Sequence, residues 1–152
     1  MAGLTVRQGE LVVTVEPGEK RRLTWFGLRT SRSKLLDGLE LRVPLADVAG
    51  VHVSDAYWEL REQMDARNTT REAQTRGTYE PSDMQPWIGI FHVTEDGVTK
   101  KKLCFIYGQH STVVAVDLKG GTETPFSSLV VTCLPYTTDS VAASIKAAAG
   151  LA

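Results

Sequence analysis

Apolar, β-branched and aromatic residues recur along the second half of the chain in short runs that turn-forming residues separate. Such residues suit a pleated, half-buried surface, so each run predicts a β-strand. Asp96-Gly97 stands between the first two runs and indicates a hairpin, because glycine supplies the positive φ of a tight turn. Because the connections are short, we expect consecutive strands to be antiparallel neighbours in a meander. The four predicted strands cover residues 87–93, 98–107, 112–118 and 126–134.

The first 54 residues show a similar alternation of short apolar runs and turn-forming residues. Residues 8–10 interrupt the first apolar stretch, and residues 16–19 predict a turn because they contain proline and glycine. Residues 22–29 are interpreted as the strand that returns from this turn. The strand-like stretches are 4–6, 11–15, 22–29, 39–43 and 48–53, and together they predict about four strands.

The end of the chain predicts a short helix. Thr137, Thr138 or Asp139 can cap its N-terminus. Val141, Ile145 and Ala148 fall at the spacing of one helical face, and Gly150 suits the position after the last helical residue. With few large apolar residues, this helix must pack on the sheet to persist.

Residues 54–86 break the strand pattern. Tyr57, Leu60 and Met64 are three and four positions apart, which favours a helix over about 55–67. Residues 68–86 are mostly polar and predict a long loop, which in a compact domain is either functional or mobile. A solvated insertion is the simpler interpretation, and a partner-binding or oligomer-forming segment is the alternative.

Length and charge limit the class of protein. At 152 residues, the chain predicts a single domain, 1–152, that can bury a core. The formal charge of −1 argues against a nucleic-acid binder, which usually carries a basic excess. No signal peptide opens the sequence, and no apolar run reaches the roughly 18 residues of a membrane span, so we expect a cytoplasmic protein. Cys104 and Cys133 lie in predicted strands and are interpreted as buried free thiols rather than a disulfide.

The order of strands, insertion, strands and terminal helix resembles the pleckstrin-homology-like (PH-like) superfamily, particularly its small bacterial members. Residues 43–51, with an apolar residue and proline before a hydrophobic turn, are similar to a strand-turn-strand motif of that family. Residues 129–132 and 139–145 look like its final strand and helix. The resemblance implies a mainly β fold with a C-terminal α-helix: a barrel of two antiparallel sheets plugged by the helix, here with an insertion at about 54–86. It also implies a binding module for phosphoinositides, peptides or proteins.

Basic residues gather around the second predicted strand and the loop after it. If this loop folds near the first turn, their side chains form a patch that suits phosphate groups or an anionic membrane surface. A solvated charged edge that discourages strand aggregation is the simpler interpretation. The candidate anion- or lipid-binding residues are Lys20, Arg21, Arg22, Arg29, Arg32 and Lys34.

Large apolar side chains in and beside the insertion are candidates for a protein-interaction surface. Most aromatic residues are expected in the core or over a barrel end, and an exposed one would mark a contact surface. The candidates are Tyr57, Trp58, Leu60, Met64 and Trp87.

The sequence contains no motif that indicates a catalytic site. His52, His92 and His110 have no metal-ligand spacing, and Ser111 lacks the flanking residues of a nucleophile elbow. We therefore expect no cofactor, no metal and no enzyme activity. The leading hypothesis is a non-catalytic interaction module that contacts a protein partner or associates with itself, through the insertion or exposed sheet edges. Binding of anionic lipid or phosphate through the basic cluster is the alternative, and an enzyme with a barrel-end pocket is a third possibility.

Overall fold

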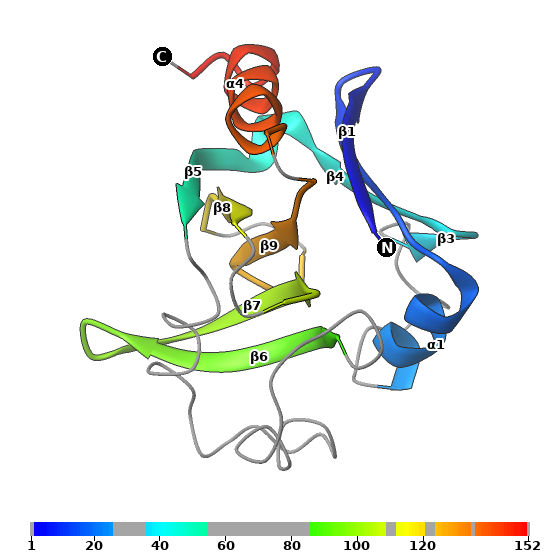
Figure 1. Cartoon of the computed structure of the whole chain (residues 1–152). Coiled ribbons are helices and arrows are strands. Elements are labelled where there is room, and N and C mark those ends of the chain that lie inside the picture. Colours follow the sequence, from blue (N-terminus) through cyan, green and yellow to red (C-terminus); the bar gives the residue numbers. More distant parts are fainter. Residues whose placement is uncertain are drawn as a thin grey trace.

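The chain forms two β-sheets and a C-terminal helix (Figure 1). The computed structural model describes residues 2–25, 36–54, 86–108, 112–120, 124–134 and 136–151. The predicted class, mainly β with a helix at the C-terminus, is confirmed. The predicted helix at 55–67 and most of the predicted insertion lie outside the described residues.

The smaller sheet contains the N-terminal strands in the order β1-β2-β4-β3. Gln8 and Gly9, with φ of 49° and 79°, form the turn of a tight β1–β2 hairpin, which the twist of the strands favours. The strands are β1 (Gly3–Arg7), β2 (Glu10–Thr14), β3 (Leu36–Asp37) and β4 (Glu40–Pro44).

The larger sheet has the order β5-β8-β9-β7-β6. A short 3₁₀ helix, η1 (Leu45–Asp47), carries the chain into it from the first sheet. Asp96 and Gly97, with φ of 49° and 77°, confirm the hairpin predicted between β6 and β7. The strands are β5 (Val48–Ser54), β6 (Trp87–Glu95), β7 (Val98–Ile106), β8 (Val113–Leu118) and β9 (Ser128–Thr132).

The predicted meander is wrong between its second and third strands, because β7 and β8 do not pair, whereas the antiparallel pairing of β8 with β9 is confirmed. Strand β9 lies between β7 and β8; it pairs with β7 in parallel and with β8 in antiparallel. All five residues of β9 are buried, so this strand belongs at the sheet centre, where both faces are covered. Strand β8 lies between β9 and β5 and pairs antiparallel with both.

The turn predicted at 16–19 and the start of the strand predicted at 22–29 are also wrong, because helix α1 (Pro17–Trp25) occupies them. Proline is preorganised for the first helical position. The Glu19 carboxylate accepts a hydrogen bond of 2.8 Å from the Glu16 backbone N–H, which satisfies a donor at the helix start. The side chain of Leu23, 1% exposed, anchors the helix in the core.

The larger sheet is buried on both faces. One face, with Leu103, Val116 and Leu129, joins the main core below the smaller sheet and the terminal helix. The opposite face carries a second cluster that includes Trp87, Cys104 and Val130. The larger sheet therefore contributes buried side chains to two separate apolar clusters.

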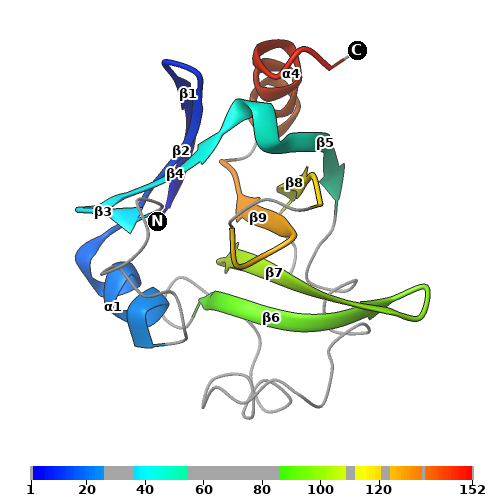
Figure 2. The same ribbon diagram turned by 180° about the vertical axis from the view of Figure 1, so that it is seen from behind.

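Helix α4 (Thr138–Ala148) confirms the predicted C-terminal helix. Gly150, with φ of +74°, follows its C-cap residue as predicted. The buried face differs in detail, because Ala142 and Ile145 are buried whereas Ala148 is exposed. Figure 2 shows from behind that α4 lies at the end of the molecule opposite β6, against β1, β5 and β8.

The two sheets are open, and among the described strands no ladder joins one sheet to the other. Helix α4 contacts strands of both sheets and thereby connects them. In the part of the chain that the structure describes, no helix is both long and apolar enough to cross a membrane.

Candidate functional site

The predicted basic cluster is described only in part. Lys20 and Arg21 lie on α1, where Lys20 is half-buried and Arg21 is exposed. The side chain of Arg22 and the whole of Arg29, Arg32 and Lys34 lie outside the described residues. Anion binding by this cluster stays a prediction.

One of the residues predicted for a protein-interaction surface, Trp87, is buried in the core. Trp87 is 1% exposed, and its ring centroid lies 6.3 Å from that of Phe91 in the second core cluster. Alternation along β6 places both side chains on the same buried face. Trp87 is a core residue and offers no contact surface. The other candidates, Tyr57, Trp58, Leu60 and Met64, lie outside the described residues.

Strand β1 is an edge strand with an unused side. The Val15 N–H donates to the Leu39 carbonyl, 2.8 Å away, so the odd-numbered residues of β2 direct their backbone groups toward β4. The even-numbered residues therefore face β1, where Thr14, Val12 and Glu10 pair with Gly3, Thr5 and Arg7. It follows that Leu4 and Val6 direct their N–H and C=O groups away from β2. Within the described part of the chain, no hydrogen bond reaches them from that side.

A groove of about 350 Å³ runs along this free edge between β1 and α4. Its lining is uncharged, with apolar side chains from both elements and two serine hydroxyl groups from the helix. Leu4, Val6 and Val141 are only partly buried against the main core. The groove residues are Leu4, Thr5 and Val6 of β1 with Ser140, Val141, Ser144 and Ile145 of α4.

The sequence predicted strand β1 but not its place at the edge of the sheet. The turn at Gln8-Gly9 was visible as an interruption, and it pairs β1 with β2. Nothing in the local pattern says whether a further strand follows on the other side of β1, because pairing partners come from distant parts of the chain.

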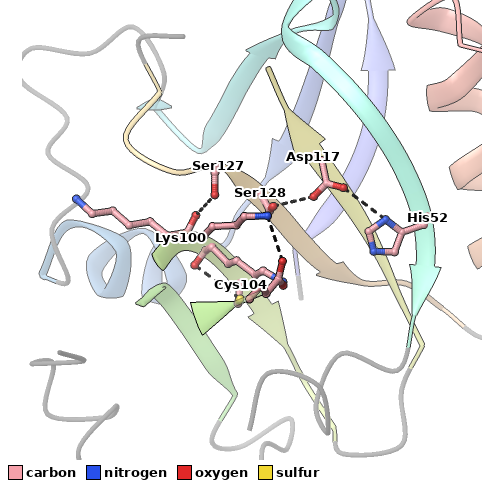
Figure 3. Close-up of polar contacts among 9 residues, drawn as sticks. His52, Lys100, Cys104, Asp117, Ser127 and Ser128 are labelled. Carbon is pink, nitrogen blue, oxygen red and sulfur yellow. Dashed lines mark hydrogen bonds and ion pairs between the residues drawn. The ribbon is translucent and has the colours of Figure 1, made fainter. Parts of the chain in front are cut away.

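A row of polar side chains crosses β7, β9 and β8 at the end of the second core face (Figure 3). Ser128 donates a 2.8 Å hydrogen bond to Asp117, whose other carboxylate oxygen lies 3.7 Å from His52 Nδ1. The arrangement is no nucleophilic triad, because the carboxylate rather than the imidazole accepts from the serine.

Glu95 binds two lysines in the same region. Its carboxylate pairs with Lys100 Nζ at 3.3 Å and with Lys102 Nζ, which lie on one face of β7 because side chains alternate along a strand. Burial alone would raise the pKa of Glu95, but the hydrogen bonds and charges of Lys102 and Lys100 hold it below its ordinary value. The Glu95 carboxylate therefore offsets part of the positive charge of these two lysines.

A buried polar chain joins the N-terminus, α1 and β7. The Ala2 N–H donates to the Tyr107 hydroxyl at 2.8 Å, and this hydroxyl donates to the carboxylate of Glu19, which is 6% exposed. Burial and the neighbouring carboxylate raise the pKa of Tyr107 well above its ordinary value, so the phenol remains protonated. These hydrogen bonds hold the N-terminus, α1 and the end of β7 in place relative to one another.

The described residues contain no group of three or more His, Cys, Asp or Glu side chains that could hold a metal ion. Cys104 is buried and Cys133 is half-buried, and both are free thiols, as predicted. Burial raises the pKa of the Cys133 thiol, which makes it a poor nucleophile.

Comparisons with protein-family models, with curated proteins and with solved structures gave no match.

Proposed function

We propose that this protein is a non-catalytic interaction module of PH-like type that binds an extended protein segment along the free edge of β1. The observation that carries the proposal is the outward-facing backbone of Leu4 and Val6 beside an uncharged groove. Strand addition of this kind takes its affinity from main-chain hydrogen bonds and its specificity from pockets for alternate side chains.

The chemistry of the groove defines the segment. Two N–H and two C=O groups of β1 require an extended backbone in register with them. The partly buried side chains of Leu4, Val6 and Val141 favour apolar residues at alternate positions of the segment, because contact removes the remaining apolar surface from water. An uncharged lining disfavours a charged residue in the groove, because such a residue would be desolvated without a partner.

The PH-like assignment is part of the proposal. Two sheets followed by a C-terminal helix that packs against both support it. The parallel pairing of β7 with β9 and the open sheets depart from the barrel that the resemblance implies. Fold does not assign function, so the proposed activity depends on the edge and the groove.

Selection from a displayed library of random peptides tests the proposal, with the full chain as bait. Val6→Pro removes the outward N–H while leaving the β1–β2 ladder bonds, since the Val6 N–H does not face β2. Val6→Thr is the matched control, because it keeps this donor and the branched shape. We expect uncharged peptides with alternating apolar residues to bind the wild type and Val6→Thr but not Val6→Pro. Selected peptides that bind all three proteins equally would refute the site.

A further inference from the structure

We infer that the segment that binds β1 is β1 of a second copy of this chain, paired antiparallel about a twofold axis at Thr5. This inference rests on the proposed function, because it names the occupant of the same edge. The reasons are the self-complementarity of the strand in backbone groups, in charge and in unburied apolar surface.

The backbone groups match in one register. With Thr5 opposite its own copy, Leu4 faces Val6 of the partner, and both direct their N–H and C=O groups to the free edge. Each such pair exchanges two hydrogen bonds, and the twofold axis repeats the pair. All four outward groups of each β1 then have a partner. Centring the axis on Leu4 or Val6 instead leaves some of them unused.

The charges are compatible with this register. Arg7, the charged residue of β1, falls opposite Gly3 of the partner and never opposite another Arg7. Its guanidinium is already paired with the Glu40 carboxylate at 2.6 Å. Like charges therefore do not face each other across the axis, where they would oppose pairing.

The apolar surface is also matched. An axis perpendicular to the sheet keeps the core-side faces of both strands on the same side, so both copies of α4 lie over the joined sheet. The partly buried side chains of Leu4 and Val6 then lie beside those of the partner strand. The exposed Thr5 side chains meet on the opposite face, and threonine pairs across strands are favourable.

Substitutions that place a positive or a negative charge at Thr5 test the inference. The measurement is light scattering of the full chain over a range of concentrations. We expect the wild type to reach twice the monomer mass of 16.6 kDa. Thr5→Lys and Thr5→Glu should each remain monomeric, because like charges then meet at the axis, and an equimolar mixture should recover the doubled mass. A wild type that stays monomeric at every concentration, or a dimer that neither variant weakens, would overturn the inference.

Disulfide trapping gives a second readout that does not depend on charge. Thr5→Cys places two thiols opposite each other at a non-hydrogen-bonded pair, where the backbones approach most closely. Gly3→Cys is the matched control, since a Cβ there meets no atom within 4 Å, and its copies would be roughly 14 Å apart at the rise of a strand. Oxidation should cross-link Thr5→Cys and not Gly3→Cys, with the wild type as background for Cys133. Equal cross-linking of both would contradict the register.

The two proposals fail in different ways. A monomeric wild type that still binds selected peptides, with loss on Val6→Pro, would end the dimer and keep the strand-addition site. A dimer that Val6→Pro and both Thr5 variants leave intact would show that copies associate elsewhere.

Discussion

Glu19 illustrates how one buried residue determines local structure at two places. Its carboxylate accepts from the Glu16 N–H at the start of α1 and from the Tyr107 hydroxyl at the end of β7. A buried carboxylate is costly unless it is hydrogen-bonded, so these donors are needed for the helix to lie where it does.

Tyr107→Phe should therefore destabilise the protein by roughly 1–3 kcal/mol, because it leaves a buried carboxylate oxygen and the Ala2 N–H without a partner. Urea unfolding measures the change. Tyr136→Phe is the matched control, since Tyr136 is fully exposed and its hydroxyl can be lost at no cost. Equal stability of Tyr107→Phe and the wild type would refute this role of the hydroxyl.

Glu95 predicts a dependence of stability on pH. Its pKa is lower in the folded protein than its ordinary value of 4.5, so the folded state favours the charged form. The resulting stabilisation is present above pH 4.5 and is lost as the pH falls through the folded-state pKa. Glu95→Gln should flatten this acid limb.

The measurement is the free energy of unfolding between pH 3 and pH 7, a window of about four units around the ordinary carboxyl pKa. Glu40→Gln serves as the comparison, because the hydrogen bonds of Arg42 and Arg7 also lower the pKa of Glu40, whose side chain is about as exposed as that of Glu95. An unchanged acid limb in Glu95→Gln would exclude the two lysines as its cause.

At the scale of elements, the local sequence pattern predicted the turns and helices whose formation depends on neighbouring residues. The β6–β7 hairpin was predicted from Asp96-Gly97, and α4 was predicted from Gly150 and the spacing of its apolar residues. The predicted N-terminal cap is not formed by Thr137, the N-cap residue, because its side chain makes no capping hydrogen bond. Helix α1 was not predicted, because Pro17-Gly18 is typical of a turn, although Pro17 followed by Glu19 is also a helix-start signal.

Gly97→Ala tests the hairpin directly. The φ of +77° at this position disfavours any residue with a Cβ, so we expect a loss of about 1 kcal/mol in urea unfolding. Gly120→Ala is the control, because Gly120 has open space and no positive φ in the disfavoured range. A loss that is the same for both variants would mean that the turn conformation does not limit stability.

At the scale of the whole molecule, the pairing of strands that are distant in the sequence could not be predicted. The buried residues of β9 indicate a central strand only once the neighbours are known, and the parallel pairing with β7 joins segments more than twenty residues apart. The same limit applies to the site. Leu4 and Val6 read as ordinary strand residues, and their free backbone groups follow from the absence of a further strand beside β1 in the described residues.

Helix α4 connects the two sheets, and Ile145 is its deepest contact. Ile145→Ala should cost roughly 2–5 kcal/mol, because it leaves a cavity in the core shared by both sheets. Thermal and urea unfolding measure the loss, and Ala143→Ser on the exposed side of α4 is the control. A small loss confined to fraying of the helix would show that the sheets are held together without it.

Amide hydrogen exchange at Leu4 and Val6 tests most directly whether the edge of β1 is an interaction site. We predict that both amides exchange slowly in concentrated protein, or with a selected peptide present, and fast on dilution; in Val6→Pro the Leu4 amide should exchange fast throughout. Fast exchange of both amides at every concentration and with every selected peptide would contradict the proposed role of this edge.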